Sequence, residues 1–164
     1  MTESLGRLCA AVPSDTPALA EVYRAAVQAA GRAAYSAPHV AAWAAYADAP
    51  AFAAEVLAGE CVLIEVQGRI AAFAQLSPND HVRLLYTHPD FMRRGFAARL
   101  LAHLEQTASE AGQTRLDTDA SPVSRPLFER AGWSLLAVQT SLHQGLSFER
   151  FRMVKDLIDP GVTR

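Results

Sequence analysis

The chain has 164 residues, of which 51% are hydrophobic and 20% charged, and its formal net charge at pH 7 is -2. This length and composition predict one globular domain, residues 1–164, with enough apolar side chains to form a core. A net charge so close to zero gives no electrostatic basis for binding nucleic acid. No apolar run is long enough to cross a membrane, so we expect no membrane partner.

The sequence also predicts the compartment. Residues 1–4 do not begin a signal peptide, because no basic region followed by an apolar core is present. Cys9 and Cys61 are too few for a disulfide framework and fall within predicted strands. We therefore expect two buried thiols in a reducing compartment and a cytoplasmic protein.

The first 57 residues predict one strand followed by helices. The strand covers residues 7–12, and Asp15 and Pro17 are suited to the start of the helix that follows. Gly31 marks the end of this helix. Further helices are predicted over residues 38–46 and 51–57. The apolar residues of the first helix recur at helical spacing: Leu19, Val22, Tyr23, Ala26 and Val27.

The middle of the chain predicts an antiparallel sheet. Two runs of strand-forming residues, 61–66 and 69–76, flank the two-residue turn at 67–68. A turn at 78–80 leads into a third strand over residues 81–87. An amphipathic helix follows and ends near residue 112, with one apolar face: Phe96, Leu100, Leu101, Leu104 and Ala108.

The last third of the chain alternates between strands and one short helix. A strand is predicted over residues 114–119 and a helix over 124–131. A hairpin with strands 133–142 and 146–156 completes the chain. No internal repeat and no linker divides the sequence, which favours a single α/β unit.

The connection between strand 81–87 and the next helix is rich in positive charge. It contains Arg93, Arg94 and Gly95 and has no acidic residue after Asp90. The unpaired N–H groups at a helix N-terminus bind phosphate, and glycine lets the backbone approach a ligand closely. The pattern therefore favours a pyrophosphate site. An ordinary connection with solvated arginines is the alternative.

This stretch resembles motif A of the GNAT superfamily of acyl-coenzyme A dependent N-acyltransferases, V-x-P-x-x-[QR]-x-x-G-x-[GA]. Thr87 and Met92 depart from the pattern, and Met92 loses a polar side chain. Because main chain would make the phosphate contacts, the expected ligand remains acetyl-CoA. The resemblance implies that acetyl-CoA contacts Leu85, Tyr86, Thr87, Met92, Arg93, Arg94, Gly95, Phe96, Ala97 and Ala98.

Residues 120–133 resemble motif B of the same superfamily, and imply further cofactor contacts at Ser121, Ser124 and Phe128. The pairs at 35–36 and 42–43 and the closing residues 151–157 are similar to a bacterial subgroup, the YafP-like acetyltransferases. The resemblance implies the GNAT fold, a mixed, mostly antiparallel central sheet with a V-shaped splay and flanking helices. It implies that acetyl-CoA enters the gap between strands 81–87 and 114–119.

Acetyl transfer to an amine requires removal of a proton, since an alkylammonium has an ordinary pKa near ~10.4. His81 stands where histone-type members carry a glutamate base, although a solvated histidine is also common at a strand start. Asp117 and Asp119 share one face of their strand and could attract a cationic amine. Asp119 is nearer the expected gap. A solvated sheet edge, contacts with arginines, and a water chain as the base remain alternatives.

The departing thiolate would often receive its proton from a tyrosine in motif B, but this position is Phe128. Tyr86, Ser121 and Ser124 are candidate replacements, and a coenzyme A thiolate can also leave unassisted. Tyr86 could instead be a core or pocket-wall aromatic. The acceptor site is expected to involve Tyr35, Trp43, Asp117 and Phe148. No Cys and His residues stand at metal-ligand spacing, so no metal is expected.

These patterns predict an N-acetyltransferase that moves acetyl from acetyl-CoA to a primary amine by direct attack in a ternary complex. The acceptor could be a small molecule or a peptide. The alternative is a non-catalytic acyl-CoA binding or sensing module, which Met92 and Phe128 favour. Pairing through the last strands, which is common in similar proteins, makes a homodimer a further expectation.

Overall fold

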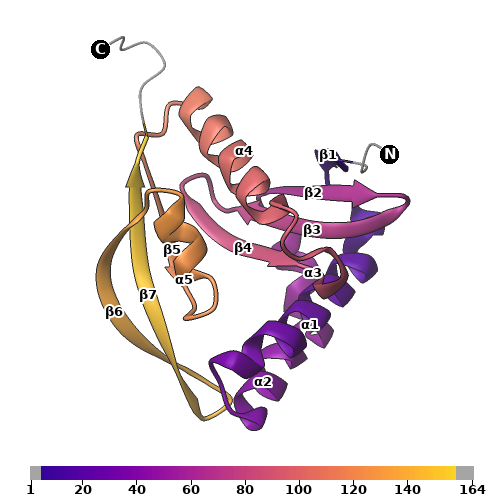
Figure 1. Ribbon diagram of the computed structural model, residues 1–164, viewed down its shortest axis with the longest axis vertical. Helices are drawn as coiled ribbons and strands as arrows, with labels where there is room; N and C mark the ends of the chain where they lie inside the picture. The colour runs from indigo at the N-terminus through magenta and orange to yellow at the C-terminus, as the bar shows by residue number, and fades with distance from the viewer. Residues whose placement is uncertain (1–4, 158–164) are drawn as a thin grey trace.

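The computed structural model describes residues 5–157, in which seven strands form one sheet (Figure 1). Residues 1–4, on which the expected lack of a signal peptide rests, lie outside this range. The strand order is β1-β2-β3-β4-β5-β7-β6. Among the described strands, only β4 and β5 are parallel neighbours, so the predicted mixed, mostly antiparallel sheet is confirmed. The strands are β1 (Arg7–Ala10), β2 (Glu60–Val66), β3 (Arg69–Leu76), β4 (His81–Thr87), β5 (Arg115–Ala120), β6 (Ser134–His143) and β7 (Leu146–Asp156).

Helices cover both faces of the sheet, because β2 and β3 carry apolar residues on both sides. On β3, Ala72 and Ala74 pack beneath α4, whereas Phe73 points to the opposite face and packs with α1 and α3. This alternation follows from the two-residue period of a strand. No described helix combines the length and hydropathy needed to cross a membrane. The helices are α1 (Thr16–Ala30), α2 (Ala37–Ala44), α3 (Pro50–Val56), α4 (Phe96–Glu110) and α5 (Arg125–Arg130).

The sheet opens between β4 and β5. These strands pair only at His81 with Asp117 and at Val82 with Thr118, where the Thr118 hydroxyl also donates to the Val82 carbonyl at 2.7 Å. Beyond these pairs the strands diverge, and Figure 1 shows the two parts of the sheet separating as a V. The predicted splay is therefore present.

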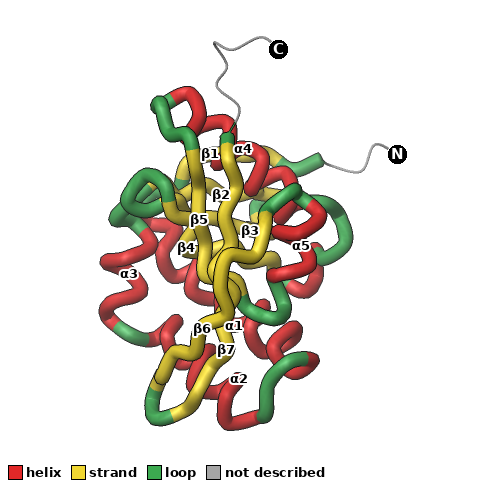
Figure 2. The backbone as a smooth tube through the Cα atoms, turned by 90° about the vertical axis from the view of Figure 1, so that its left-hand side faces the viewer, coloured by secondary structure: helices red, strands yellow, loops and turns green. Residues whose placement is uncertain are grey.

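The β6–β7 hairpin extends beyond the other strands to α2. Figure 2 shows its turn beside this helix. His39 of α2 contacts the Ser147 carbonyl at 3.1 Å, and His143 contacts the Ala42 carbonyl at 3.2 Å. These contacts close one side of the V, so that α1, α2 and β7 surround the space next to the open end of β4.

Local hydrogen bonds shift some predicted boundaries. β1 ends at Ala10 because the chain turns into a 3-10 helix, where the Val12 N–H donates to the Asp15 carboxylate at 2.8 Å. β6 begins one residue after Trp133, whose N–H bonds to the Phe128 carbonyl at 3.0 Å and completes the turn after α5. The other predicted elements agree with the observed ones within two residues.

The two thiols differ in burial. Cys61 is buried as predicted, and this burial raises the pKa of its thiol to about 12. Cys9 is only half-buried, contrary to expectation, because β1 is an edge strand of the sheet and one side of it has no neighbour. Both cysteines are free thiols.

Candidate active site

A cavity of about 190 Å³ occupies the opening between β4 and β5. Its wall is formed by α1, α2, β4, Met92, the first turn of α4, the end of β5, the segment leading into α5, α5 itself, and β7. Ten predicted site residues contribute to this wall: Trp43, Leu85, Tyr86, Thr87, Met92, Ala97, Asp119, Ser121, Ser124 and Phe128. Nine others lie outside it: Tyr35, His81, Arg93, Arg94, Gly95, Phe96, Ala98, Asp117 and Phe148.

The open edge of β4 offers main-chain hydrogen-bonding groups to a ligand. The His88 N–H donates to the Ala71 carbonyl at 2.8 Å, which shows that even-numbered residues at this end direct their main chain toward β3. Because the direction alternates along a strand, the N–H and C=O groups of Leu85 and Thr87 point toward the gap. An amide-containing ligand could therefore pair with β4 as a short strand would.

The connection before α4 forms a second set of main-chain donors. Arg93 and Gly95 both have left-handed backbone conformations, with φ of 63° and 77°. The N–H groups of residues 93–98, which we call the phosphate loop, have no acceptor within residues 5–157. Converging N–H groups of this kind, at the N-terminus of a 15-residue helix, suit an anion such as pyrophosphate.

Gly95 is required by backbone conformation rather than by space. A Cβ atom added there would meet no other atom within 4 Å, but its φ is one that side-chain-bearing residues rarely adopt. Met92, at the departure from motif A, lines the cavity and is 47% exposed. The loop geometry therefore forms without a polar side chain at position 92.

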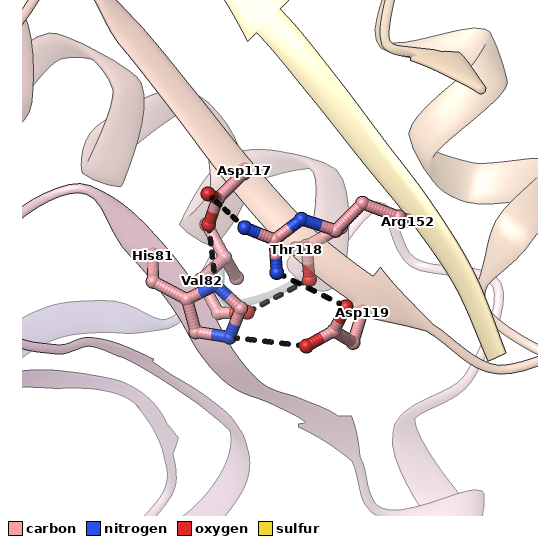
Figure 3. Close-up of polar contacts among 6 residues, drawn as sticks. All are labelled: His81, Val82, Asp117, Thr118, Asp119 and Arg152. Atoms are coloured by element: carbon pink, nitrogen blue, oxygen red, sulfur yellow. Dashed lines mark hydrogen bonds and ion pairs between the residues drawn. The ribbon is translucent and has the colours of Figure 1, made fainter. Parts of the chain in front are cut away.

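Four charged or titratable side chains form a cluster where β4 and β5 separate (Figure 3). We call His81, Asp117, Asp119 and Arg152 the Arg152 cluster. The Arg152 guanidinium donates to Asp117 at 2.7 Å and to Asp119 at 3.3 Å. His81 Nδ1 contacts the other Asp117 oxygen, and His81 Nε2 lies 3.9 Å from Asp119.

Strand register explains this arrangement. His81 is the β4 partner of Asp117, and Arg152 on β7 is the partner of Asp119. The aspartates lie two residues apart, so both project to one face of β5. Asp119 alone of the four lines the cavity. The cluster thus places one carboxylate at the cavity wall and connects it to a histidine that is 25% exposed.

Tyr86 lies on the cavity wall within a group of aromatic rings. Its ring centroid is 4.6 Å from that of Tyr23, 5.8 Å from that of Phe73 and 6.4 Å from that of Trp43. Burial raises the pKa of Tyr86, while the charge of Arg150 acts in the opposite direction. The hydroxyl is therefore neutral at physiological pH, and it can donate a proton but cannot serve as a base.

Phe128 also faces the cavity, with only 2% of its surface exposed, and packs edge-on against Trp133 at 5.0 Å between centroids. Its ring offers no proton. Ser121 and Ser124 lie nearby and bond to each other, with each main-chain N–H donating to the other hydroxyl at 3.0 and 3.1 Å. These bonds fix the entry to α5 and occupy both hydroxyls as acceptors.

The aromatic residues expected at the acceptor side have different positions. Trp43 reaches the cavity, whereas Phe148 is 1% exposed and lies in the core beneath it. Tyr35 packs against Phe148, with ring centroids 5.2 Å apart, and its hydroxyl donates to the Glu149 carbonyl at 3.3 Å. Tyr35 and Phe148 therefore support the wall and do not form its surface.

Two arginines of β7 were absent from the sequence-based expectations. Arg150 lines the cavity, and Arg152 connects both aspartates. Arg150 and Arg152 lie two residues apart on a predicted strand, as Asp117 and Asp119 do, so each pair shares one face of its strand. This matching spacing was the sequence signal that could have indicated an ion-pair cluster. It could not be used without knowing that β5 and β7 are neighbours.

Within residues 5–157, no group of three His, Cys, Asp or Glu side chains is arranged to hold a metal ion.

Comparison with known proteins agrees with this geometry. A family model described as an acetyltransferase (GNAT) domain matches residues 31–155. The chain belongs to the GNAT acetyltransferase family, as the two motifs predicted.

Solved structures show the same fold. A GCN5-related N-acetyltransferase from Rhodopseudomonas palustris is 30% identical, with a TM-score of 0.91 over 96% of this chain and 99% of that one. YncA from Salmonella typhimurium, solved with its cofactor acetyl-CoA, is 20% identical, with a TM-score of 0.65 over 98% of this chain and 99% of its own. The predicted GNAT fold is confirmed.

The predicted similarity to YafP is also found. The uncharacterized N-acetyltransferase YafP of Escherichia coli strain K12 is 34% identical over 73 residues, which are 44% of this chain. The alignment spans 45% of that relative's length. The similarity therefore concerns less than half of either protein.

Proposed function

We propose that this protein transfers the acetyl group of acetyl-CoA to a primary amine by direct attack within a ternary complex. The observation that carries the proposal is the continuity of three features. The phosphate loop, the open main-chain edge of β4 and the cavity wall at Asp119 follow one another along the splay. This order matches the order of pyrophosphate, pantetheine and thioester in acetyl-CoA.

The phosphate loop would hold the pyrophosphate through its N–H groups, and Arg93 and Arg94 add positive charge beside it. Leu85 and Thr87 would hold the pantetheine amides through their main chain. When bound, acetyl-CoA supplies a thioester carbonyl carbon for attack. Donors along β4 would orient and polarise this carbonyl.

Asp119 is the proposed proton acceptor, acting directly or through one water molecule. The amine has to lose a proton to attack, and this proton passes to Asp119 and on to His81 and solvent. Arg152 keeps the two aspartates in place. As the C–N bond forms and the C–S bond breaks, the thiolate leaves with the electron pair, and Tyr86 is the proposed donor of its proton. The nitrogen loses its second proton as the amide forms, and this proton returns to Tyr86 through water.

The first experiment is calorimetric titration of the purified protein with acetyl-CoA, coenzyme A and ATP. We expect micromolar binding of both coenzyme A ligands and at least tenfold weaker binding of ATP, because only the former carry pantetheine. A screen of amines for thiol release would follow. Binding without release for any amine would favour the alternative, an acyl-CoA binding or sensing module, for which the absence of a donor at Phe128 is the supporting observation.

A further inference from the structure

Among the described residues, Arg150 is a cavity-lining cation without a counter-charge. Of the two arginines on the wall, Arg83 forms an ion pair with Glu55 at 2.8 Å. Arg150 has no carboxylate partner within residues 5–157 and is half-buried. Partial burial of an unpaired charge is unfavourable, so the cavity favours a ligand that brings an anionic group.

Aromatic rings determine how Arg150 can receive that group. Its guanidinium carbon lies 5.7 Å from the ring centroid of Trp43 and 5.8 Å from that of Phe148, within cation–π range. The guanidinium thus lies between two rings, and its N–H groups have no hydrogen-bond acceptor within residues 5–157. A guanidinium edge matches a planar carboxylate, which it binds through two parallel hydrogen bonds.

The surroundings of Arg150 indicate a ligand of small size. Ala26, Val27 and Ala30 of α1 line the same cavity as Arg150, and the whole cavity has a volume of about 190 Å³. The charge of Arg150 also lowers the pKa of Tyr86 against the larger effect of burial, so the two side chains are electrostatically coupled. An anion on Arg150 would thus lie close to the proposed reaction centre.

This anion is better assigned to the acceptor than to acetyl-CoA. The phosphate loop precedes α4, whereas Arg150 lies on β7 and contacts Trp43 of α2. We propose that the acceptor is a small amino acid whose carboxylate binds Arg150 while its amine faces Asp119. This inference rests on the proposed acetyl transfer, and it names the substrate class.

The test compares each amino acid with two relatives that lack the carboxylate. Glycine, L-alanine, L-valine, L-leucine and L-methionine, their amides and their decarboxylated amines are titrated into the coenzyme A-loaded protein. The same compounds are assayed for thiol release from acetyl-CoA. The amide is a weaker base and the decarboxylated amine a stronger base than the acid, so a preference for the acid over both cannot come from amine basicity.

We expect at least one acid to bind more tightly than both of its relatives. Arg150→Gln should weaken binding of that acid about 10- to 100-fold and raise its KM similarly, with little change in affinity for the amide. Arg150→Lys should retain part of the preference because the charge remains. Arg32→Gln, which removes an exposed arginine outside the cavity, should change neither value.

Three results would overturn the inference: equal binding of acid and amide, no binding of any acid, or loss of acetyl-CoA affinity in Arg150→Gln. The last would assign Arg150 to the cosubstrate. Failure of the transferase proposal is a separate result. Arg150-dependent binding of an acid without thiol release would support the carboxylate site and contradict acetyl transfer.

Discussion

Asp119 and His81 have distinct positions in the Arg152 cluster. Asp119 touches the cavity, and His81 stands behind it with access to solvent. In the proposed mechanism, a base at the wall and a histidine behind it give the amine proton a path to solvent. At the residue scale, contact with Arg152 does not distinguish Asp117 from Asp119, because both aspartates have it. Asp119 is the candidate base because it alone of the two lines the cavity.

Asp119→Asn should lower kcat/KM at neutral pH about 100-fold, in the range found for loss of a general base. The loss should shrink as pH rises, because the amine then deprotonates without help. Rate measurements from pH 6 to 10 would check this. Asp156→Asn is the control, since Asp156 pairs with Arg115 at the far end of β7. A pH–rate profile unchanged by Asp119→Asn would remove this residue from the base role, and His81→Ala tests the relay in the same way.

Tyr86 and Phe128 face one cavity, which allows a rescue experiment. Tyr86→Phe should lower kcat about 10-fold, less than a typical acid–base loss because a thiolate is a good leaving group. Since burial raises the pKa of Tyr86, the group is protonated at neutral and mildly alkaline pH, and the loss should be equal at pH 7 and pH 9. Adding Phe128→Tyr should restore activity. An unaffected kcat in Tyr86→Phe would show that the thiolate leaves unassisted.

At the scale of elements, α4 carries the proposed phosphate-binding loop at its N-terminus and a structural role along its length. Its apolar face packs on the sheet, and Lys155 of β7 and Trp133 both donate to Glu105 near its middle, at 3.0 and 2.8 Å. These contacts fix the helix against the second part of the sheet. The phosphate loop is thereby held at a constant position relative to the splay.

Gly95→Val should weaken acetyl-CoA binding about 10- to 100-fold, because valine disfavours positive φ and would distort the loop. Gly112→Val is a matched control. Gly112 also has positive φ, with no atom within 4 Å of an added Cβ, but lies at the other end of α4. Both variants should lose about 1–2 kcal/mol of unfolding free energy. Calorimetry should find reduced affinity in Gly95→Val alone, and equal affinities would contradict the phosphate-loop assignment.

At the scale of the whole molecule, two cores meet across β2 and β3. The core beneath α1, α2 and α3 includes Phe73 and continues through Tyr86 to the cavity wall. The core beneath α4 continues through Phe128 to the opposite wall. The cavity is therefore bounded by both cores, and its shape depends on their packing.

Phe73→Ala should lower the free energy of unfolding by about 3–5 kcal/mol, because a fully buried ring is replaced by a cavity. Leu142→Ala is the control. Leu142 is 77% exposed on the outer hairpin strand, so its loss should cost less than about 0.5 kcal/mol. Denaturant unfolding measures both values. A loss below 1 kcal/mol in Phe73→Ala would mean that this core relaxes around the change.

Local patterns predicted the order of elements, the apolar face of the helix after strand 81–87 and the glycine-containing connection that precedes it. They could do so because strand alternation, helical periodicity and a glycine before a helix are properties of neighbouring residues. Tertiary structure decided which charges meet. Arg152 is 33 residues from Asp119, and Arg150 stands more than 100 residues from Trp43. Only the placement of β7 beside β5, and of the hairpin beside α2, brings these side chains to one cavity, because such pairing depends on the register of distant strands.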